Sequence, residues 1–475
     1  MAEPHRTPRA GAARTAPNGC RGRAVTVMGL GLFGGGVGAA RYFARHGARV
    51  TVTDLKGAEA LAPSLRALEG LPIRFHLGEH DAADFTAADI VAVSPAVPKT
   101  SVYLRMAEEA GADITSEMNL FVERCPAPIV GVTGTSGKST TTALVGEMLS
   151  RAGRARVGGN IGKSLLDELD AIRPDETVVL EVSSFQLEDL ARIAWSPPTA
   201  VVTNIAPNHL DRHGTMAAYI EAKKNILRFQ TADGIAVLNA DDDEVRAWQA
   251  DARGRVVLYS RDQALPEGVF AAGPEVVFRL GAREERVDVA GRMKLRGGHN
   301  LWNVVAAAAA ARVLGVPPGA IAEAVAAFEP LPHRLQPLGR RDGVLFVDDS
   351  KATTPAASAL AMEAFTEPVV LIAGGYDKHS DPRVMVEAIR RRAKAVVLIG
   401  ATAGALERAI GADGPAVERA GALEEAVARA AALAKAGDVV LLAPGHASWD
   451  MFDNYERRGE VFRRAALDLG MTREA

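Results

Sequence analysis

Residues 129–142 hold the side chains in this sequence that are best suited to bind a phosphate group. A β-branched run at the start predicts a buried strand, and the glycine-rich turn after it ends in Gly137, Lys138 and Ser139. Apolar residues at helical spacing predict a helix over 140–151. Such a turn aims backbone N–H groups and a helix N-terminus at an anion, while the lysine meets the outer phosphates and the hydroxyl meets Mg²⁺. The sequence therefore predicts a site for the phosphates of ATP or GTP.

The glycine spacing departs from the general form of this loop. The general pattern has a glycine five residues before Gly137, where this chain has Val132, and Gly131 comes one residue early. A glycine-rich turn that binds nothing is the ordinary alternative. We favour phosphate binding because Gly-Lys-Ser stands between a predicted strand and a predicted helix.

Three further candidates lie downstream of this loop. Glu181 is a lone carboxylate near the end of a buried strand pattern at 178–182, and a buried acid is costly unless it is paired or bound to metal. It is a candidate Mg²⁺ ligand, with a structural salt bridge as the alternative. His209 stands in a polar loop after a strand, where α/β proteins place ligands, although a single histidine is more often a surface or packing residue. Lys223 lies on a predicted helix over 216–229, where a solvated face is its ordinary explanation.

Residues 24–54 have the layout of a Rossmann-type unit. A strand pattern leads into a turn with glycines at 29, 31 and 34, a helix pattern follows, and a second strand ends at Asp54. This layout is compatible with NAD binding, with another nucleotide or nucleotide-sugar, and with a tight turn that only packs a helix on a strand.

Three polar loops follow predicted strands in the last third of the chain, at 348–354, 374–378 and 444–448. Loops at the carboxyl ends of neighbouring parallel strands converge on one crevice. Their lysines and hydroxyls suit a small anionic ligand, although each loop taken singly has ordinary polarity.

Length and composition limit the class of protein. At 475 residues the chain is expected to form about three domains, and its net charge of −3 gives no support for nucleic-acid or membrane-surface binding. Cys20 and Cys125 are the only cysteines, which excludes a disulfide framework and suits a reducing cytoplasm. No segment is apolar for long enough to predict a membrane span.

The expected fold class is α/β in three domains. A tail at 1–22, rich in Arg, Ala, Pro and Gly, is expected to be disordered. A Rossmann-like domain is expected at 23–125, a P-loop domain with a mostly parallel sheet and a small β subdomain at 126–331, and a Rossmann-like C-terminal domain at 332–475.

Together these motifs resemble the Mur ligases of peptidoglycan synthesis, over nearly the whole chain from about residue 24. Residues 131–139 resemble the family's own variant of the phosphate loop, and the segments 181–188 and 349–353 are the most discriminating. The resemblance implies a monomeric cytoplasmic ligase that uses ATP to add D-glutamate to UDP-N-acetylmuramoyl-L-alanine through an acyl phosphate. Its partners would be these small molecules, with no nucleic acid and no membrane insertion.

The resemblance also implies a role for each matched residue. The catalytic residues would be Lys138, Glu181, His209 and Lys223. One or two Mg²⁺ would be held by Ser139, Glu181, His209 and Lys223, the last as a carbamate. ATP would be bound by Gly134, Thr135, Ser136, Gly137, Lys138, Ser139, Thr140, Asn300, Asn303, Arg334, Asp349 and Lys351. The UDP substrate would be bound by Leu32, Phe33, Asp54, Leu55, Lys56, Ser94, Asn160 and His209, and D-glutamate by Thr353, Lys378, Ser448 and Tyr455.

Three substrates drawn from three domains must be brought together, which predicts a hinged closure near residues 330–334. Two other functions stay open from the residues alone. An NAD-dependent oxidoreductase would explain the glycine turn and Asp54 but not the phosphate loop. A non-catalytic nucleotide-sensing protein would keep the folds without turnover, and the intact Lys138, Glu181 and Lys223 argue against it.

Overall fold

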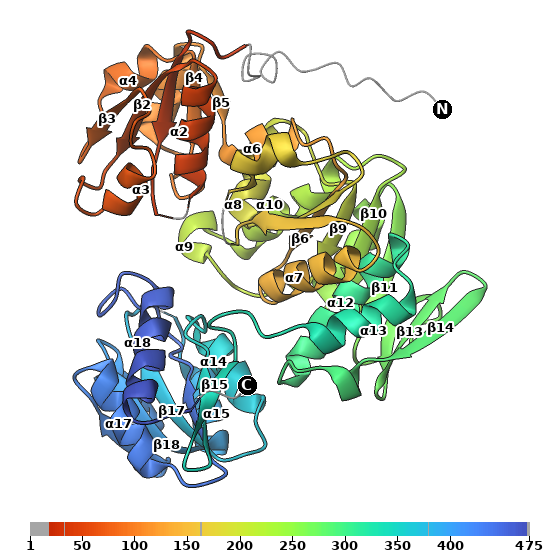
Figure 1. Ribbon diagram of the computed structural model, residues 1–475, viewed down its shortest axis with the longest axis vertical. Coiled ribbons are helices and arrows are strands. Elements are labelled where there is room, and N and C mark those ends of the chain that lie inside the picture. The colour runs from red at the N-terminus through yellow and green to blue at the C-terminus, as the bar shows by residue number, and fades with distance from the viewer. Residues whose placement is uncertain (1–18, 33, 162–163, 379, 473–475) are drawn as a thin grey trace. The chain divides into compact units, whose positions relative to one another are not determined.

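The computed structural model describes residues 19–32, 34–161, 164–378 and 380–472 (Figure 1). Phe33 and most of the predicted tail lie outside these residues. The chain forms two compact units, the first made of Met1–Asp288 with Asn303–Ala324 and the second of Val289–Trp302 with Val325–Ala475. Both units are α/β.

The first unit begins with a parallel sheet of five strands in the order β3-β2-β1-β4-β5. The strands are β1 (Ala24–Met28), β2 (Arg49–Asp54), β3 (Ile73–Leu77), β4 (Ile90–Val93) and β5 (Asp113–Thr115). The helices are α2 (Gly35–Arg45), α3 (Ala62–Arg66), α4 (Ala82–Thr86), α5 (Val102–Glu109) and α6 (Glu117–Val122). The strands and the helix predicted around the glycine turn are confirmed.

A nine-stranded sheet follows in the same unit, in the order β14-β13-β12-β11-β10-β9-β6-β8-β7. Its strands are β6 (Ile129–Thr133), β7 (Ala155–Gly159), β8 (Thr177–Glu181), β9 (Thr199–Val202), β10 (Ile235–Asn239), β11 (Arg255–Ser260), β12 (Gly268–Ala272), β13 (Glu275–Leu280) and β14 (Arg283–Asp288). The pairs β12–β13 and β13–β14 are antiparallel, and the other pairs are parallel. The small β region expected before residue 290 therefore continues the edge of the central sheet.

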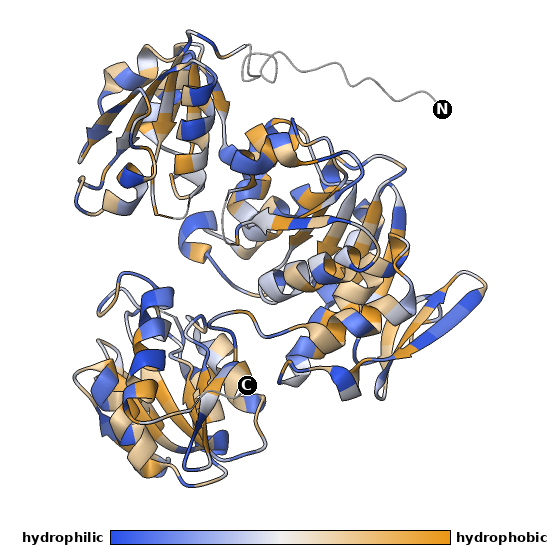
Figure 2. Ribbon diagram, viewed as in Figure 1, coloured by the Kyte–Doolittle hydropathy of each residue, from blue (hydrophilic) through white to orange (hydrophobic). Residues whose placement is uncertain are grey.

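Helices alternate with these strands, of which β6, β8, β9 and β10 are buried and β14 is largely exposed. They are α7 (Lys138–Ser150), α8 (Ser184–Arg192), α9 (Leu210–His213), α10 (Met216–Arg228), α11 (Asp243–Ala247), α12 (Gly298–Val313) and α13 (Pro318–Ala327), with 3₁₀ turns at Leu165–Ala171, Trp248–Asp251 and Ala290–Arg292. Figure 2 shows apolar strands inside the sheets and polar residues on the outer helix faces. The alanine run at 306–311 is fully buried, so α12 packs closely on its neighbours.

The second unit has a six-stranded sheet in the order β15-β16-β20-β17-β18-β19, antiparallel only between β15 and β16. Its strands are β15 (Gln336–Arg341), β16 (Val344–Asp348), β17 (Val369–Gly374), β18 (Ala393–Ile399), β19 (Ala416–Arg419) and β20 (Val439–Leu442). Its helices are α14 (Pro355–Glu363), α15 (Arg383–Arg392), α16 (Ala403–Ile410), α17 (Leu423–Leu433) and α18 (Tyr455–Asp468). Among the helices of the described residues, none is long and apolar enough to cross a membrane.

Replacing Gly36 at the start of α2 by alanine is expected to destabilise the first unit. The new Cβ would lie 2.4 Å from the carbonyl oxygen of Leu30 and 2.6 Å from that of Gly29, so the backbone would have to move. We expect a loss of roughly 1–3 kcal/mol in the free energy of unfolding, measured by urea denaturation. Gly153→Ala is the matched control, because nothing lies within 4 Å of its added Cβ. Equal losses in the two variants would contradict this account.

Candidate active site

The phosphate loop joins β6 to α7, and β6 lies between β9 and β8 in the central sheet. Gly137 has a left-handed conformation with a φ of 81° and precedes the first residue of α7, and no described side chain caps this helix. The first N–H groups of a 13-residue helix therefore point at whatever occupies the loop, with the positive end of the helix dipole behind them. This geometry confirms the predicted strand, turn and helix.

The irregular glycine spacing has a packing explanation. Gly131 lies inside β6, and a Cβ at this position would come within 2.6 Å of the Pro197 ring. Gly134 is the first glycine of the loop itself, and a Cβ there would come within 1.9 Å of the hydroxyl of Thr203. The early glycine therefore belongs to the strand and is no part of the phosphate loop.

Two residues after β9 hold the loop in shape. The Thr203 hydroxyl donates to the carbonyl oxygen of Ser136 at 2.7 Å. The side chain of Asn204 accepts from the N–H of Ser136 at 2.9 Å and donates to its carbonyl oxygen at 3.0 Å. β9 is the neighbour of β6 in the sheet, so the end of one strand supports the loop after the other. Neither residue is recognisable as functional from the sequence, because short polar residues after a strand are common.

Ser139 and Glu181 meet beneath the loop. β8 pairs with β6 on its other side, and Glu181 is the last residue of β8. The Ser139 hydroxyl donates to the Glu181 carboxylate at 2.5 Å, and both residues are buried. The side-chain amide of Asn160 donates to the other carboxylate oxygen at 2.9 Å. The structure thus brings together three residues that the sequence analysis assigned to metal or substrate binding.

These oxygen atoms are suited to Mg²⁺. Within the described part of the chain, no three His, Cys, Asp or Glu side chains form a metal-binding group. Mg²⁺ does not need such a cage, because it is commonly held by one or two carboxylates together with water and substrate phosphates. A buried carboxylate beside a serine hydroxyl at a phosphate loop fits that donor set.

Two lysines share one carbonyl oxygen of the loop. The ammonium groups of Lys138 and Lys223 donate to the Gly134 carbonyl at 3.0 and 2.8 Å. Lys138 also donates to the Thr135 carbonyl, whereas Lys223 is buried and lies over the Tyr219 ring at 4.9 Å. Burial and the charge of Lys138 lower the pKa of Lys223 well below its ordinary value, against the opposing charge of Glu181. Lys223 therefore does not lie on a solvated helix face, which was the ordinary explanation for a lysine on this helix.

The neighbouring Lys224 has a different environment. Its ammonium forms an ion pair with Asp251 at 2.9 Å and lies 5.9 Å from the centre of the Trp248 ring. The partners of Lys224 therefore lie outside the phosphate loop, whereas Lys223 contacts the Gly134 carbonyl of that loop.

His209 stands in a turn organised by Phe185. His209 has a positive φ of 54° and its imidazole packs edge-on against the Phe185 ring, with ring centres 5.2 Å apart. His213 stacks on the same ring, with ring centres 5.0 Å apart. Its Nε2 atom forms a hydrogen bond with the Ser184 hydroxyl at 2.9 Å. Phe185 therefore holds the histidine turn, a role that the sequence analysis missed because it depends on contacts between distant segments.

The glycine turn after β1 is closed by Asp54. The carboxylate accepts from the N–H of Gly31 at 3.1 Å and from the N–H of Lys56 at 2.9 Å. A dinucleotide site of the NAD type uses this acid for a ribose hydroxyl, whereas here it already binds the turn. Leu32 and Leu55 flank the turn with exposed side chains.

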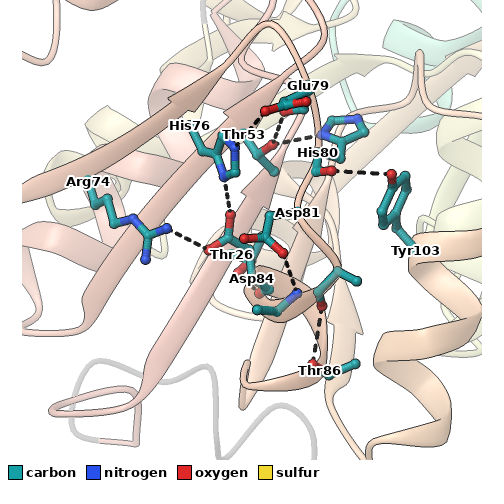
Figure 3. A network of polar contacts seen from close by, with 12 residues as sticks. Thr26, Thr53, Arg74, His76, Glu79, His80, Asp81, Asp84, Thr86 and Tyr103 are labelled. Atoms are coloured by element: carbon teal, nitrogen blue, oxygen red, sulfur yellow. Dashed lines mark hydrogen bonds and ion pairs between the residues drawn. The ribbon is translucent and has the colours of Figure 1, made fainter.

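Ser94 and a network of polar side chains lie near the same glycine turn. The N–H of Ser94 bonds the carbonyl of Met28 at the end of β1, so Ser94 borders the same strand end. Figure 3 shows the adjoining network, in which Asp84 pairs with His76 at 2.7 Å and Thr53 bonds the ring of His80 at 2.7 Å. The prediction for Phe33 lies outside the described residues.

The three polar loops of the second unit are tied together by hydrogen bonds, which confirms their predicted convergence. The N–H of Gly445 bonds the carbonyl of Ala352 at 2.8 Å, and the N–H of Tyr376 bonds that of Ala447 at 2.8 Å. Their strands β16, β20 and β17 are neighbours in the sheet.

A buried arginine clamps two of these loops. The Arg458 guanidinium donates to the hydroxyl and carbonyl of Ser350 at 3.0 and 2.8 Å, and to the carbonyl of His446 at 3.1 Å. Burial lowers the pKa of Arg458 to about 10, against the charges of Asp450 and Asp348. Arg458 is not recognisable as functional from the sequence, because a single arginine on an amphipathic helix gives no sign of burial.

Asp349 and Arg334 lie at a constrained turn. His333 and Leu335, on either side of Arg334, have positive φ values of 61° and 42°. The Asp349 carboxylate accepts from the N–H of Leu335 at 3.1 Å, and His333 bonds the Asp348 carboxylate at 2.7 Å. Burial raises the pKa of Asp349 to about 7, although the Leu335 hydrogen bond and the charge of Arg334 oppose this.

The remaining predicted residues of this unit border the same loops. Lys351 lies over the Tyr455 ring at 4.9 Å, and Lys378 over the Trp449 ring at 4.4 Å. Ser448 is buried, and Thr353 is half-buried beside Thr354, which caps α14.

The two predicted asparagines stand in the first turns of α12. The Asn300 side chain donates to the carbonyl of Arg296 at 2.7 Å. Asn303 accepts from the Thr141 hydroxyl at 3.3 Å, and its side chain lies where a Cβ on Gly137 would be. Asn303 thus lies against the phosphate loop.

Three family models match successive parts of the chain. They describe a Mur ligase MurD-like N-terminal domain at residues 23–116, a Mur ligase middle domain at 132–311, and a Mur ligase glutamate ligase domain at 333–446. A UDP-N-acetylmuramoylalanine--D-glutamate ligase of Roseiflexus sp. (strain RS-1) is 46% identical over 460 residues, which cover 93% of this chain and 98% of that protein. The chain belongs to the Mur ligase family. An enzyme of the same name from Symbiobacterium thermophilum is 42% identical, covering 92% of this Mur ligase and 96% of its own length.

Solved structures agree with this Mur ligase in fold. The UDP-N-acetylmuramate-alanine ligase MurC of Thermotoga maritima matches with a TM-score of 0.62 and 20% identity, covering 94% of this chain and all of its own. A MurF ligase of Thermotoga maritima in complex with ADP matches with a TM-score of 0.57 and 20% identity, covering 97% of this chain and all of its own. The predicted α/β fold class is confirmed.

Asp349→Asn is expected to change how stability depends on pH. Between about pH 4 and pH 7 the folded chain keeps a proton on Asp349 that the unfolded chain releases, so rising pH costs stability in this window. Asparagine has no proton to lose and can still accept from Leu335. We expect the difference in melting temperature, variant minus parent, to be larger at pH 8 than at pH 5 by roughly 3–6 °C.

Asp342→Asn is the control for this measurement, because Asp342 lies in the same unit with its side chain 83% exposed. Differential scanning calorimetry of both variants over the pH series gives the comparison. A difference for Asp349→Asn that stays constant with pH would contradict the assigned pKa.

Proposed function

We propose that this Mur ligase joins D-glutamate to UDP-N-acetylmuramoyl-L-alanine at the expense of ATP. The observation that carries the proposal is the phosphate loop with Ser139, Glu181 and Lys223 gathered beneath it. The substrate identities are supported by the names of relatives that are 39–46% identical over nearly their whole length. We further propose that the chain acts as a cytoplasmic monomer.

Each part of the chain has a separate task in this proposal. The phosphate loop and α12 bind ATP, and the glycine turn after β1 binds the UDP group, with Leu32, Asp54 and Ser94 at its border. The converging loops of the second unit bind D-glutamate, since their lysines and hydroxyls suit its two carboxylates. Asp349 and Arg334 take part in binding the nucleotide.

The chemistry is activation of a carboxylate. An oxygen of the alanyl carboxylate attacks the γ-phosphorus of ATP, the bond to the β-phosphate oxygen breaks, and ADP leaves. The amine of D-glutamate then attacks the acyl carbonyl, loses a proton and expels phosphate from a tetrahedral intermediate. An anionic nucleophile approaching a polyanion needs charge neutralisation, which the Lys138 ammonium and the N–H groups of α7 supply.

The Glu181 carboxylate and the Ser139 hydroxyl would hold Mg²⁺, which supplies further neutralisation of the phosphate oxygens when bound. His209 is proposed to join them. Lys223 is proposed to take part as a carbamate, because burial lowers its pKa and so favours the neutral amine, the form that reacts with carbon dioxide. In that reaction a C–N bond forms, the nitrogen releases a proton to water, and a neutral amine becomes an anion suited to a metal.

Phosphate release tests the proposal directly. With ATP, Mg²⁺ and UDP-N-acetylmuramoyl-L-alanine present, we expect D-glutamate to give turnover and L-glutamate, D-aspartate and L-alanine to give background. Turnover with another amino acid would overturn the substrate assignment. Background with every amino acid would favour a nucleotide-binding protein without catalysis.

Lys138→Ala is expected to lower turnover by at least about 100-fold, the effect typical of removing one charge-stabilising group from a transition state. The UDP substrate should still bind within about three-fold of the parent in calorimetry, because Lys138 lies on the phosphate loop. Loss of UDP-substrate binding in this variant would contradict its assigned role.

Lys223→Ala should abolish a carbamate signal that Lys224→Ala retains. We expect ¹³C NMR in ¹³C-bicarbonate with Mg²⁺ to show one carbamate resonance in the parent and in Lys224→Ala. Lys224 is a matched control because it is the next residue on the same helix and pairs with Asp251. A spectrum of the parent without this resonance would show that Lys223 acts as a free amine.

A further inference from the structure

Two exposed aromatic rings stand beside Lys378 in the second unit. The residues Tyr376 and Trp449 are 44% and 61% exposed, and their ring centres are 5.6 Å apart. The ammonium of Lys378 lies 4.4 Å from the centre of the Trp449 ring. Exposed aromatic surface is unfavourable in water, so such a pair next to a candidate ligand residue suggests a binding role.

The backbone beneath these rings is held firmly. The N–H of Tyr376 bonds the carbonyl of Ala447, and the N–H of Gly375 bonds the Thr402 hydroxyl at 3.1 Å. On the other loop, the Asp450 carboxylate accepts from the N–H of Ala401 at 2.8 Å. Hydrogen bonds therefore hold the backbone of both loops that carry these rings. An exposed pair on a fixed backbone favours a positioning role over an accidental exposure.

Lysine needs positioning more than most ligand residues. Its ammonium is carried on a flexible four-carbon stem, and holding it in one place costs side-chain entropy. The face of an indole ring attracts a cation and so restricts where the ammonium group lies. A lysine over an exposed tryptophan is therefore already placed to receive a carboxylate.

We propose that Trp449 positions Lys378 for a carboxylate of the amino-acid substrate, and that the Trp449 and Tyr376 rings form the wall along its methylene groups. This inference rests on the proposed function, because it assigns specificity at the same amino-acid site. Trp449 is a positioning residue, since it acts through Lys378.

Two variants separate the role of the ring face from that of apolar bulk. Trp449→Leu keeps apolar volume but loses the aromatic face, whereas Trp449→Phe keeps a face for the cation. We expect Trp449→Leu to raise KM for D-glutamate by roughly two- to five-fold, the factor typical of an exposed cation–π contact. The kcat and the KM values for ATP and the UDP substrate should stay within about 1.5-fold, and Trp449→Phe should resemble the parent.

Leu360→Ala is the control, because Leu360 on α14 is also an exposed apolar residue of this unit, at 43%. An unchanged KM for D-glutamate in Trp449→Leu would overturn the inference. So would a lowered melting temperature with all constants changed together, which would indicate a structural role. If the parent itself shows no amino-acid-dependent phosphate release, the proposed function fails, and that result is distinct from failure of the role of Trp449.

Discussion

Two lysine side chains donate to a single backbone carbonyl, that of Gly134, and the phosphate site depends on this contact. Two ammonium groups on one oxygen repel each other, and the repulsion is strong where water is excluded. Lys138 is half-buried and can turn toward an anion. Lys223 is buried, and its pKa is lowered because burial makes the charged ammonium unfavourable. The loop therefore favours either a bound polyanion or a neutralised Lys223.

The order of strands in the central sheet explains why these groups meet. β6 lies between β8 and β9, so the residues at the ends of three adjacent strands surround one loop. β8 ends at Glu181, β9 leads to Thr203 and Asn204, and β6 leads to the loop. The second unit repeats the principle with β16, β20 and β17. Arg458 clamps the loops after β16 and β20, and the N–H of Tyr376 ties the loop after β17 to them.

Local sequence patterns were sufficient for many of the strands and helices and for several residues at strand ends. Hydrophobic periodicity gave most strands of both units, and the predicted loops met because carboxyl ends of parallel strands share an edge. The features that depend on contacts between segments distant in the sequence could not be predicted. Pro197 makes Gly131 a packing residue, Phe185 holds the histidine turn, and Arg458 is buried, and none of these facts is written in neighbouring residues. The burial of Lys223 likewise depends on contacts between distant segments.

The central claim is that the site activates a carboxylate by phosphorylating it. The most direct test follows an oxygen atom, with UDP-N-acetylmuramoyl-L-alanine labelled by ¹⁸O in its alanyl carboxylate and turned over with ATP and D-glutamate. An acyl phosphate passes one carboxylate oxygen to the released phosphate, so mass spectrometry should find one ¹⁸O in each phosphate formed from fully labelled substrate. Phosphate without ¹⁸O, formed at the rate of the amide product, would contradict the account.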